Sequence, residues 1–246
     1  MSIVEPDLES MPDDWERALA IVAHPDDMEY GASSAVAAWT SAGKSVAYVL
    51  VTRGEAGIDG MDPAETSTVR LAEQQAACDA VGVDVLEFLD HPDGVLEYGL
   101  PLRRDLARAI RRHRPELIIT LNHRERFGKG GGVNMSDHRV VGEAVIDATR
   151  DAGNRWVFTD LLDEGHEPWT GTRWVAVANS PEPTHAVDIS DTLARGVASL
   201  AAHKQYLDAL GPGPMADPAG FLQSMAETSS QRFGGTLAMT FELLPM

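Results

Sequence analysis

Short apolar runs alternate with longer segments of helical periodicity along the first 152 residues of the chain. An uninterrupted apolar run suits a strand that is buried on both faces, and apolar residues spaced three or four positions apart suit a helix with one buried side. The runs predict strands over residues 18–23, 45–51, 83–89 and 117–121. The helical spacing predicts helices over residues 29–42, 69–81, 100–112 and 138–152.

The regular alternation of strands and helices predicts right-handed β–α–β units, and therefore a parallel sheet with helices packed on it. Beyond residue 152 the pattern is less regular. There it predicts strands over residues 173–178, 185–187 and 237–243 and one long helix over residues 190–210, before a break at Gly211–Gly213. We expect an α/β fold with a Rossmann-like, mostly parallel sheet flanked by helices and a less regular C-terminal part.

The length of 246 residues fits one domain, and the hydrophobic fraction of 43% is enough for a sizeable core. We expect a single domain over residues 1–246, in which residues 1–13 form a flexible lead-in. A single cysteine, Cys78, excludes an internal disulfide, and its alanine-rich surroundings predict a buried, apolar role for it.

The chain carries a formal net charge of -18. An acidic chain repels phosphate backbones and anionic membrane surfaces, so we expect neither nucleic acid nor a membrane surface as a partner. One short basic run, Arg111–Arg114, lies at the end of a predicted helix, where positive side chains meet the negative partial charge of the helix terminus. That position explains the run without a binding function.

No apolar run reaches the roughly 18 residues that a membrane-spanning helix needs. The N-terminal segment is acidic and polar, which is unlike a secretory signal peptide. We therefore expect a soluble, cytoplasmic protein without a membrane span.

The segment His24–Asp27, which reads His-Pro-Asp-Asp, directly follows the first predicted strand. Ligands of open α/β sheets bind beyond the carboxyl ends of the strands, and Pro25 should keep His24 extended at that edge. Asp26 and Asp27 would repel each other in so sharp a turn unless a cation or protons compensated their charge. Histidine and carboxylate together suit zinc, and a catalytic zinc site needs a third protein ligand and an open position.

A simpler alternative is an aspartate that caps the following helix, beside a solvated histidine. It accounts for one aspartate and leaves the other aspartate and His24 unexplained. A third metal ligand should come from another strand end, and three histidines are placed for it: His91, His123 and His138. His138 begins a predicted helix beside Asp137, which could orient its imidazole. Spacing alone does not choose among the three.

The motifs of the chain resemble those of the LmbE-like or PIG-L family of zinc-dependent N-acetylglucosaminyl deacetylases. The resemblance is good over about residues 18–150 and looser after them. The segments that carry it are Ala23–Glu29 for the motif A-H-P-D-D-E, Thr52–Gly57 for T-R-G-E-x-G, Arg70 and Glu73 for R-x-x-E, Asp93-Gly94 for D-G, Arg114-Pro115 for R-P, Met135–His138 for H-P-D-H, and Ala202–Gln205 for a late A-H-x-x-Q. Met28 takes the place of the glutamate in the first motif, with Glu29 next to it, and the late segment is one residue short.

The resemblance implies a hydrolase site whose residues correspond to the family position by position. The implied Zn2+ ligands are His24, Asp27 and His138. Asp26 is implied to be the general base on the water that the metal activates. Substrate contacts are implied for Arg53 and Asp93. The implied reaction removes an N-acyl group, usually N-acetyl in this family, from a glucosamine-containing small molecule.

One departure from the family concerns Met135. The histidine that the family has there stabilises the oxyanion or protonates the leaving amine, and a thioether does neither. Asp137 loses the partner that it has in the family. His123 and the backbone N–H groups of Gly128–Gly132 are the substitutes that the sequence offers. Because one lost oxyanion donor costs roughly 2.7–4 kcal/mol in other hydrolases, we expect a slower reaction and not an abolished one.

Two other functions fit the same sequence. One keeps the metal site and changes the substrate, as in an amidase on a thiol conjugate or a tailoring deacetylase on a glycosylated natural product. The other is a metal-binding member with altered or lost catalysis that binds a sugar or a partner, and Met135 motivates it. Specificity should lie in the loops over residues 57–66, 124–134 and 212–231. The sequence leaves the oligomeric state open, a homo-oligomer included.

Overall fold

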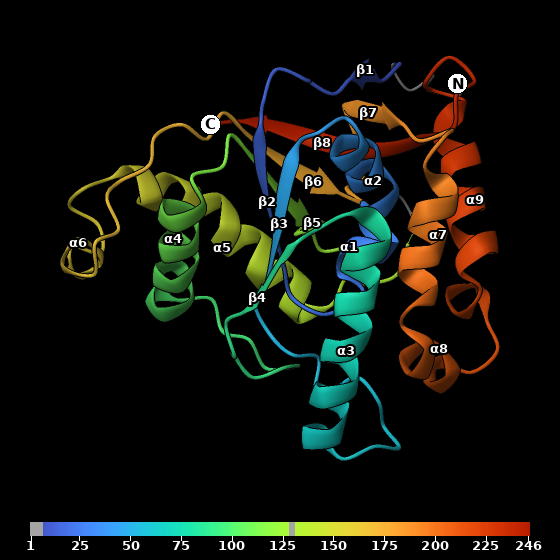
Figure 1. Cartoon of the computed structure of the whole chain (residues 1–246), viewed down its shortest axis with the longest axis horizontal. Helices are drawn as coiled ribbons and strands as arrows, with labels where there is room; N and C mark the ends of the chain where they lie inside the picture. The colour runs from blue at the N-terminus through green and yellow to red at the C-terminus, as the bar shows by residue number, and fades with distance from the viewer. Residues whose placement is uncertain (1–6, 128–130) are drawn as a thin grey trace.

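The computed structural model describes residues 7–127 and 131–246, and within these ranges eight strands form one sheet in the order β1-β7-β8-β6-β5-β2-β3-β4 (Figure 1). The strands are β1 (Glu9–Ser10), β2 (Arg17–Val22), β3 (Ser45–Leu50), β4 (Val85–Phe88), β5 (Leu117–Leu121), β6 (Trp174–Ala178), β7 (His185–Asp188) and β8 (Ala238–Pro245). The helices are α1 (Asp27–Gly31), α2 (Ser33–Ser41), α3 (Pro63–Val81), α4 (Leu100–His113), α5 (Ser136–Gly153), α6 (Asp160–Asp163), α7 (Leu193–Ala201), α8 (Lys204–Leu210) and α9 (Pro218–Ser230), with a 3-10 turn η1 (Pro214–Ala216).

The sheet is parallel except at β8, which runs antiparallel to both of its neighbours, β6 and β7. The predicted α/β fold with a mostly parallel sheet is thereby confirmed. From β2 the chain passes to β3 and β4 on one side of β2, and it then crosses to β5 on the other side. The carboxyl ends of β2 and β5 therefore border the switch point of the sheet, where α/β proteins bind their ligands.

Both faces of the central strands are buried, as their apolar runs predict. Leu19 and Ile21 of β2 belong to a core with α4 and α5, whereas Ala20 and Val22 belong to a core with α1, α2, α3, α7 and α9. Figure 1 shows the same division, with α4 and α5 on one side of the sheet and α2, α7 and α9 on the other. Because successive side chains of β2 alternate between two apolar cores, polar chemistry can begin only after the strand, at His24.

Two of the predicted helices are each divided in the structure. The segment over residues 29–42 separates at Ala32, where φ is -151°, into α1 and α2, and α1 already begins at Asp27. The segment over residues 190–210 separates at Ala202 and His203 into α7 and α8. The apolar spacing continues through both breaks because the two halves of each pair face the same core.

The C-terminal part contains a helix that the sequence pattern misses. Most of the segment over residues 212–231, expected to be a loop, forms α9, which buries Leu222 and Ala226. Its start carries recognisable signals, because the Asp217 side chain accepts a hydrogen bond from the Gly220 N–H and a proline follows Asp217.

The expected flexible lead-in over residues 1–13 is wrong for the part that the structure describes. Strand β1 pairs in parallel with β7 at the sheet edge, and Leu8 and Met11 on either side of β1 are buried. Residues 1–6 lie outside the described ranges. The pattern missed β1 because two residues are too few to show a period.

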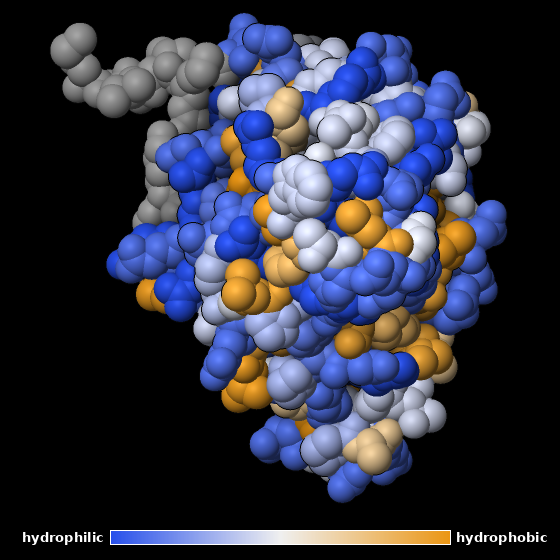
Figure 2. Space-filling model, turned by 90° about the vertical axis from the view of Figure 1, so that its left-hand side faces the viewer, coloured by the Kyte–Doolittle hydropathy of each residue, from blue (hydrophilic) through white to orange (hydrophobic). Residues whose placement is uncertain are grey.

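The molecular surface around α4 and α6 is largely hydrophilic, with apolar residues in small, scattered groups (Figure 2). Arg104 and Arg108 of α4 both form ion pairs with Glu164, which follows α6. Within the described ranges, the helices include none that is long and apolar enough to cross a bilayer.

Arg111, the first residue of the basic run, has a different role from the one predicted. Its side chain is only 2% exposed. The guanidinium donates hydrogen bonds to the carbonyl oxygens of Asp151, Ala152 and Asn154 at the C-terminal end of α5. Arg111 therefore satisfies the last carbonyl groups of a neighbouring helix, and it does not act on the end of its own helix.

Replacing Arg111 with leucine should lower the free energy of unfolding by about 3 kcal/mol, because several buried carbonyl groups lose their charged donor. The control is Arg112→Ala, which removes an exposed ion pair with Glu87 and should cost less than about 1 kcal/mol. Urea unfolding followed by circular dichroism measures both variants. Equal destabilisation by the two would show that Arg111 does not cap α5.

Candidate metal centre at the end of the second strand

The turn after β2 arranges three functional side chains in four residues. Asp26 has a φ of 86°, a left-handed conformation that aspartate tolerates better than most residues. Immediately after it, Asp27 begins α1, and its carboxylate accepts a hydrogen bond of 2.8 Å from the backbone N–H of His24. All three side chains are buried. The turn thus brings His24 and Asp27 side by side at the sheet edge.

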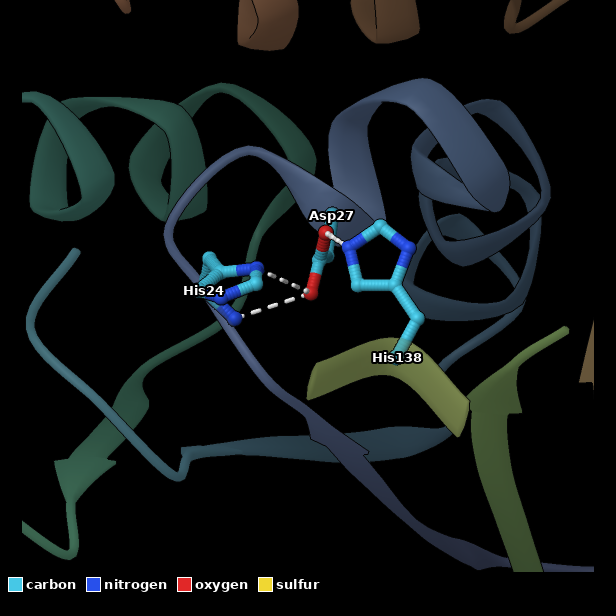
Figure 3. Close-up of side chains that lie close together, drawn as sticks. All are labelled: His24, Asp27 and His138. Carbon is cyan, nitrogen blue, oxygen red and sulfur yellow. Dashed lines mark hydrogen bonds and ion pairs between the residues drawn. The ribbon is translucent and has the colours of Figure 1, made fainter. Parts of the chain in front are cut away.

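Two histidines approach the Asp27 carboxylate from opposite sides (Figure 3). Its Oδ1 lies 3.0 Å from Nε2 of His138, near the start of α5, and its Oδ2 lies 3.6 Å from Nδ1 of His24. One ligand atom from each of these three residues lies within 4.8 Å of the others. Two nitrogen donors and one oxygen donor at this spacing can hold a divalent metal ion.

The other ring nitrogen of each histidine already faces an oxygen acceptor. Nδ1 of His138 lies 3.2 Å from Oδ1 of Asn134, and Nε2 of His24 lies 3.0 Å from Oδ1 of Asp93. An acceptor at that position favours a proton on the nitrogen that faces it, so the second nitrogen, on the side of Asp27, is the one that would bind a metal ion through its lone pair. The protein therefore sets the tautomer and ring orientation that a metal ligand requires.

Asp93 and Asp137 lie together behind His24. Asp137 Oδ2 lies 3.4 Å from Nε2 of His24 and accepts a hydrogen bond of 2.8 Å from the Gly94 N–H. Asp93 contacts His24 through one oxygen and accepts a hydrogen bond of 2.8 Å from the Ala56 N–H through the other. In the absence of a histidine at position 135, Asp137 is thus paired with His24 and with backbone amides.

The charges of this cluster decide its ionisation. Burial raises the pKa of Asp27, but His138 and His24 lower it by more, so the pKa of Asp27 lies well below its usual range. Burial lowers the pKa of His24, but Asp27, Asp137 and Asp93 raise it well above its usual value. Three carboxylates beside two imidazoles carry an excess of negative charge, which a divalent cation would complement.

The Asp26 carboxylate pairs with a residue from another element. Its Oδ2 lies 3.2 Å from Nη2 of Arg70 on α3, and Arg70 is 3% exposed. Burial raises the pKa of Asp26, the charge of Arg70 opposes the rise and the neighbouring Asp27 adds to it, so the pKa lies above its usual value. A buried carboxylate next to the metal-ligating cluster is placed to accept and release a proton.

Arg70 also joins two loops of the site. Its guanidinium donates hydrogen bonds to the carbonyl oxygens of Pro25, in the turn after β2, and Gly54, in the loop after β3. Gly54 has a φ of +66°, and a Cβ on it would lie 2.4 Å from Nη1 of Arg70. A Cβ on Gly57 would lie 2.3 Å from the same atom. The glycines of the T-R-G-E-x-G motif therefore make room for an arginine to which the sequence analysis gave no role.

Arg53 lies in a neighbouring cavity of about 280 Å3 that Glu55 and Asp90 also line. Its guanidinium forms an ion pair with Asp90 and lies over the ring of Phe88, with 5.1 Å between Cζ and the ring centroid. Glu55 accepts a hydrogen bond of 2.9 Å from the Asp93 N–H. Glu55 therefore links the lining of the cavity to the backbone of Asp93.

Two of the three histidines considered for the third ligand position lie elsewhere. His91 forms a pair with Asp105 over 3.1 Å. His123 has Arg124 as a neighbour, and burial followed by the charge of Arg124 lowers its pKa. Neither belongs to a cluster of metal-ligating groups in the described part of the chain, whereas His138 does.

Met135 stands immediately before α5 and is 52% exposed. The ring of Phe127 meets His138 edge to face, with 6.2 Å between the ring centroids. Of the glycine loop that we considered as a source of backbone donors, Gly128–Gly130 lie outside the described residues. The rim of the centre on this side therefore presents apolar side chains near His138.

A buried polar network next to Asp26 escaped the sequence analysis. Glu29 and His203 are fully buried, and Oε2 of Glu29 lies 3.5 Å from Nε2 of His203. Gln74 donates a hydrogen bond of 3.1 Å to Glu29 and accepts one of 3.1 Å from the Asp26 N–H. Glu29 and His203 fall in motif segments, but nothing in the sequence shows that these two distant segments meet.

The chain is similar to proteins of a known family. Residues 19–149 match the model of the PIG-L family, which is described as GlcNAc-PI de-N-acetylase. A diacetylchitobiose deacetylase of Thermococcus kodakarensis is 28% identical over 197 residues, which cover 78% of this chain and 70% of the relative. A 1D-myo-inositol 2-acetamido-2-deoxy-alpha-D-glucopyranoside deacetylase of Kineococcus radiotolerans is 29% identical over 169 residues, which cover 55% of this chain and 45% of the relative.

The fold also matches solved structures. The N,N'-diacetylchitobiose deacetylase from Pyrococcus horikoshii, complexed with its inhibitor MPG, aligns with a TM-score of 0.84 and 22% sequence identity. The alignment covers 94% of this chain and 85% of that one. At this identity the likeness establishes the shared fold alone.

Asp137→Asn should weaken the affinity for a divalent metal ion by roughly ten- to hundredfold, because His24 loses a negative charge behind its Nε2. The matched control is Asp105→Asn, which alters the pair of Asp105 with His91 and should leave the affinity unchanged. Competition with a chromophoric chelator, with Zn2+ or Co2+ as the probe, measures both. A wild-type affinity in Asp137→Asn would contradict the orienting role of Asp137.

Proposed function

The chain belongs to the PIG-L family, and from that membership we propose that it is a zinc-dependent amide hydrolase that removes an N-acyl group, first of all N-acetyl, from a glucosamine-containing small molecule. The observation that carries the proposal is the convergence of His24, Asp27 and His138 next to the buried Asp26. The names of both curated relatives describe deacetylases of acetylated amino sugars.

The donor set of the centre fits zinc. Two imidazole nitrogens and one carboxylate oxygen are a usual set of protein ligands in catalytic zinc sites, which keep one position open. His24, Asp27 and His138 would hold the ion. Zinc supplies a Lewis acid that lowers the pKa of water and polarises a carbonyl group. The contacts behind His24 and His138 keep both rings turned towards the metal position.

We assign proton transfer to Asp26. Its buried carboxylate has a raised pKa and is held by Arg70, so it can accept the proton of the attacking water. Amide hydrolysis also requires a proton on the leaving nitrogen. Met135 cannot donate this proton. We therefore propose that Asp26, which holds the proton taken from the attacking water, passes it to the leaving nitrogen.

We assign the sugar to the cavity that contains Arg53. Its lining by Arg53, Glu55 and Asp90 offers donors and acceptors for hydroxyl groups, and Glu55 connects it to Asp93, which contacts His24. Both carboxylate oxygens of Asp93 already have partners, His24 and the Ala56 N–H. These contacts favour an orienting role for Asp93 behind His24 over a direct substrate contact.

The competing function is a metal-binding protein without turnover, which would bind a sugar or a partner. The exposed Met135 favours it, since it stands where a histidine is expected in this family. The buried Asp26 carboxylate, which Arg70 holds next to the metal-ligating cluster, favours the enzyme, because a binding protein has no need of a buried proton acceptor there. The acidic composition and the single cysteine support a cytoplasmic location for either function.

Asp26→Asn should retain one equivalent of zinc and lose at least about a hundredfold in kcat for deacetylation, because the proton acceptor is gone while the ligands remain. Asparagine also tolerates the left-handed turn, which alanine would strain. The control is Asp208→Asn, which alters only an exposed pair with Lys204. Zinc is measured by elemental analysis and kcat by acetate release. Turnover equal to the wild type's would remove Asp26 from the mechanism.

The substrate class is tested with a panel that contains N,N'-diacetylchitobiose, an N-acetylglucosaminyl inositol and a glucosaminide with a longer N-acyl chain. We expect acetate release from at least one acetylated member, its loss after treatment with a chelator and its return on addition of Zn2+. A protein with full zinc occupancy that hydrolyses no member of the panel would favour the binding function instead.

A further inference from the structure

The segment from α8 to η1 is bound to α3, which carries Arg70, and to α1, which directly follows Asp26. In Figure 1 α8 lies beside α3, with which it is in contact. In its first turn the backbone N–H of Gln205 donates a hydrogen bond of 2.5 Å to Oε1 of Glu73 on α3. Shortly after α8, the carbonyl oxygen of Met215 accepts a hydrogen bond of 2.6 Å from the hydroxyl of Tyr30 on α1. The segment is thus held at both ends.

Within this segment, Tyr206 covers the guanidinium of Arg70. The Cζ atom of Arg70 lies 4.4 Å from the centroid of the phenol ring. The two terminal nitrogens of the guanidinium, Nη1 and Nη2, are directed to Asp26 and to backbone carbonyl oxygens, and the aromatic ring covers one face of the group. Glu73 lies one helical turn after Arg70, and its hydrogen bond to α8 therefore sets the ring at this position.

We propose that Tyr206 is a positioning residue for the Asp26 carboxylate: its ring holds the Arg70 guanidinium in place, and its hydroxyl donates a hydrogen bond to that carboxylate. The inference rests on the proposed function, which gives Asp26 the transfer of the proton. Tyr206 lies outside residues 19–149, which match the family model. The C-terminal part of the chain therefore takes part in holding the proton acceptor.

The ionisation of the phenol agrees with this contact. Burial and then the Asp26 carboxylate raise the pKa of Tyr206, and the phenol and the carboxylate interact as a hydrogen-bonded pair. A phenol with a raised pKa remains protonated at neutral pH and keeps its donor. Tyr30, the other phenol near Asp26, uses its hydroxyl on the Met215 carbonyl oxygen.

Positioning matters for Asp26 because its backbone leaves the side chain little support. It stands in a left-handed turn before the first residue of α1, and its side chain caps no helical N–H. Proton transfer requires the carboxylate to stay within hydrogen-bond reach of its target, in one orientation. Donors from Arg70 and Tyr206, on two different helices, would limit the carboxylate to one rotamer.

The test compares Tyr206→Phe, which keeps the ring over Arg70, with Tyr206→Leu, which removes both ring and hydroxyl. The matched control is Tyr98→Phe, because Tyr98 also donates its hydroxyl to a carboxylate, that of Asp147, at an exposed position. Acetate release gives kcat and KM, elemental analysis gives zinc content, and crystal structures of the zinc-loaded wild type and both Tyr206 variants show the Asp26 carboxylate.

Tyr206→Phe should lower kcat roughly ten- to hundredfold at an unchanged KM and full zinc content, because a hydrogen bond to a charged group is lost. Tyr206→Leu should lower kcat further, and its crystal structure should show Asp26 and Arg70 beyond the 3.2 Å of the intact pair. Tyr98→Phe should keep the wild-type values.

A wild-type kcat in Tyr206→Phe would overturn the inference, and so would a fall in kcat that only parallels a loss of zinc. Failure of the proposed function is a different result: no acetate release by the wild type from any substrate. In that case kcat cannot be compared, and the crystal structures alone test whether Tyr206 positions Asp26. An Asp26 carboxylate that superposes on the wild type in both variants overturns the inference, and a displaced one supports it. If Tyr206→Leu does not fold, the structure of Tyr206→Phe decides.

Discussion

The geometry of the candidate metal centre depends on the contacts of one buried group, the guanidinium of Arg70. It pairs with Asp26 and binds carbonyl oxygens of two loops, so a helix and the ends of two neighbouring strands are held by one charge. Removing Asp26 or the carbonyl contacts would leave a buried positive charge without compensation, and removing Arg70 would leave the Asp26 carboxylate buried without its ion-pair partner. Glycines at positions 54 and 57 leave space for the guanidinium, since a Cβ at either position would lie within 2.4 Å of Nη1 of Arg70.

The adjacent carboxylates of Asp26 and Asp27 lie in two different electrostatic environments, although one turn carries both. Burial raises the pKa of both carboxyl groups, but the imidazoles on either side of Asp27 lower its pKa by more, whereas the pKa of Asp26 stays raised. Neighbouring acids whose pKa values are driven apart are a common basis for dividing roles in an active site. The division arises from which helix each side chain meets: Asp27 meets His138 from α5, and Asp26 meets Arg70 from α3.

The sequence predicted what depends on neighbours along the chain and missed what depends on contacts between distant segments. The apolar runs located β2 and β5 closely, and the motif at the end of β2 indicated two members of the cluster of metal-ligating side chains, because strand burial and a sharp turn are local properties. No local signal joins Tyr206 to Arg70, or Arg111 to the end of α5. The division of α7 from α8 was missed for the same reason, because the apolar spacing passes through it unchanged.

The position of β8 also constrains how this protein can fold as it is synthesised. It is the last strand in chain order, yet it lies inside the sheet between β6 and β7. On the ribosome, β2 to β6 can assemble first, with β6 as a temporary edge whose backbone groups are unpaired. Neither β7 nor β1, at the start of the described chain, can join the sheet until β8 has emerged. The nascent protein therefore passes through a stage in which the backbone groups along the edge of β6 are unpaired and open to pairing with other chains, and only the synthesis of β8 closes that edge.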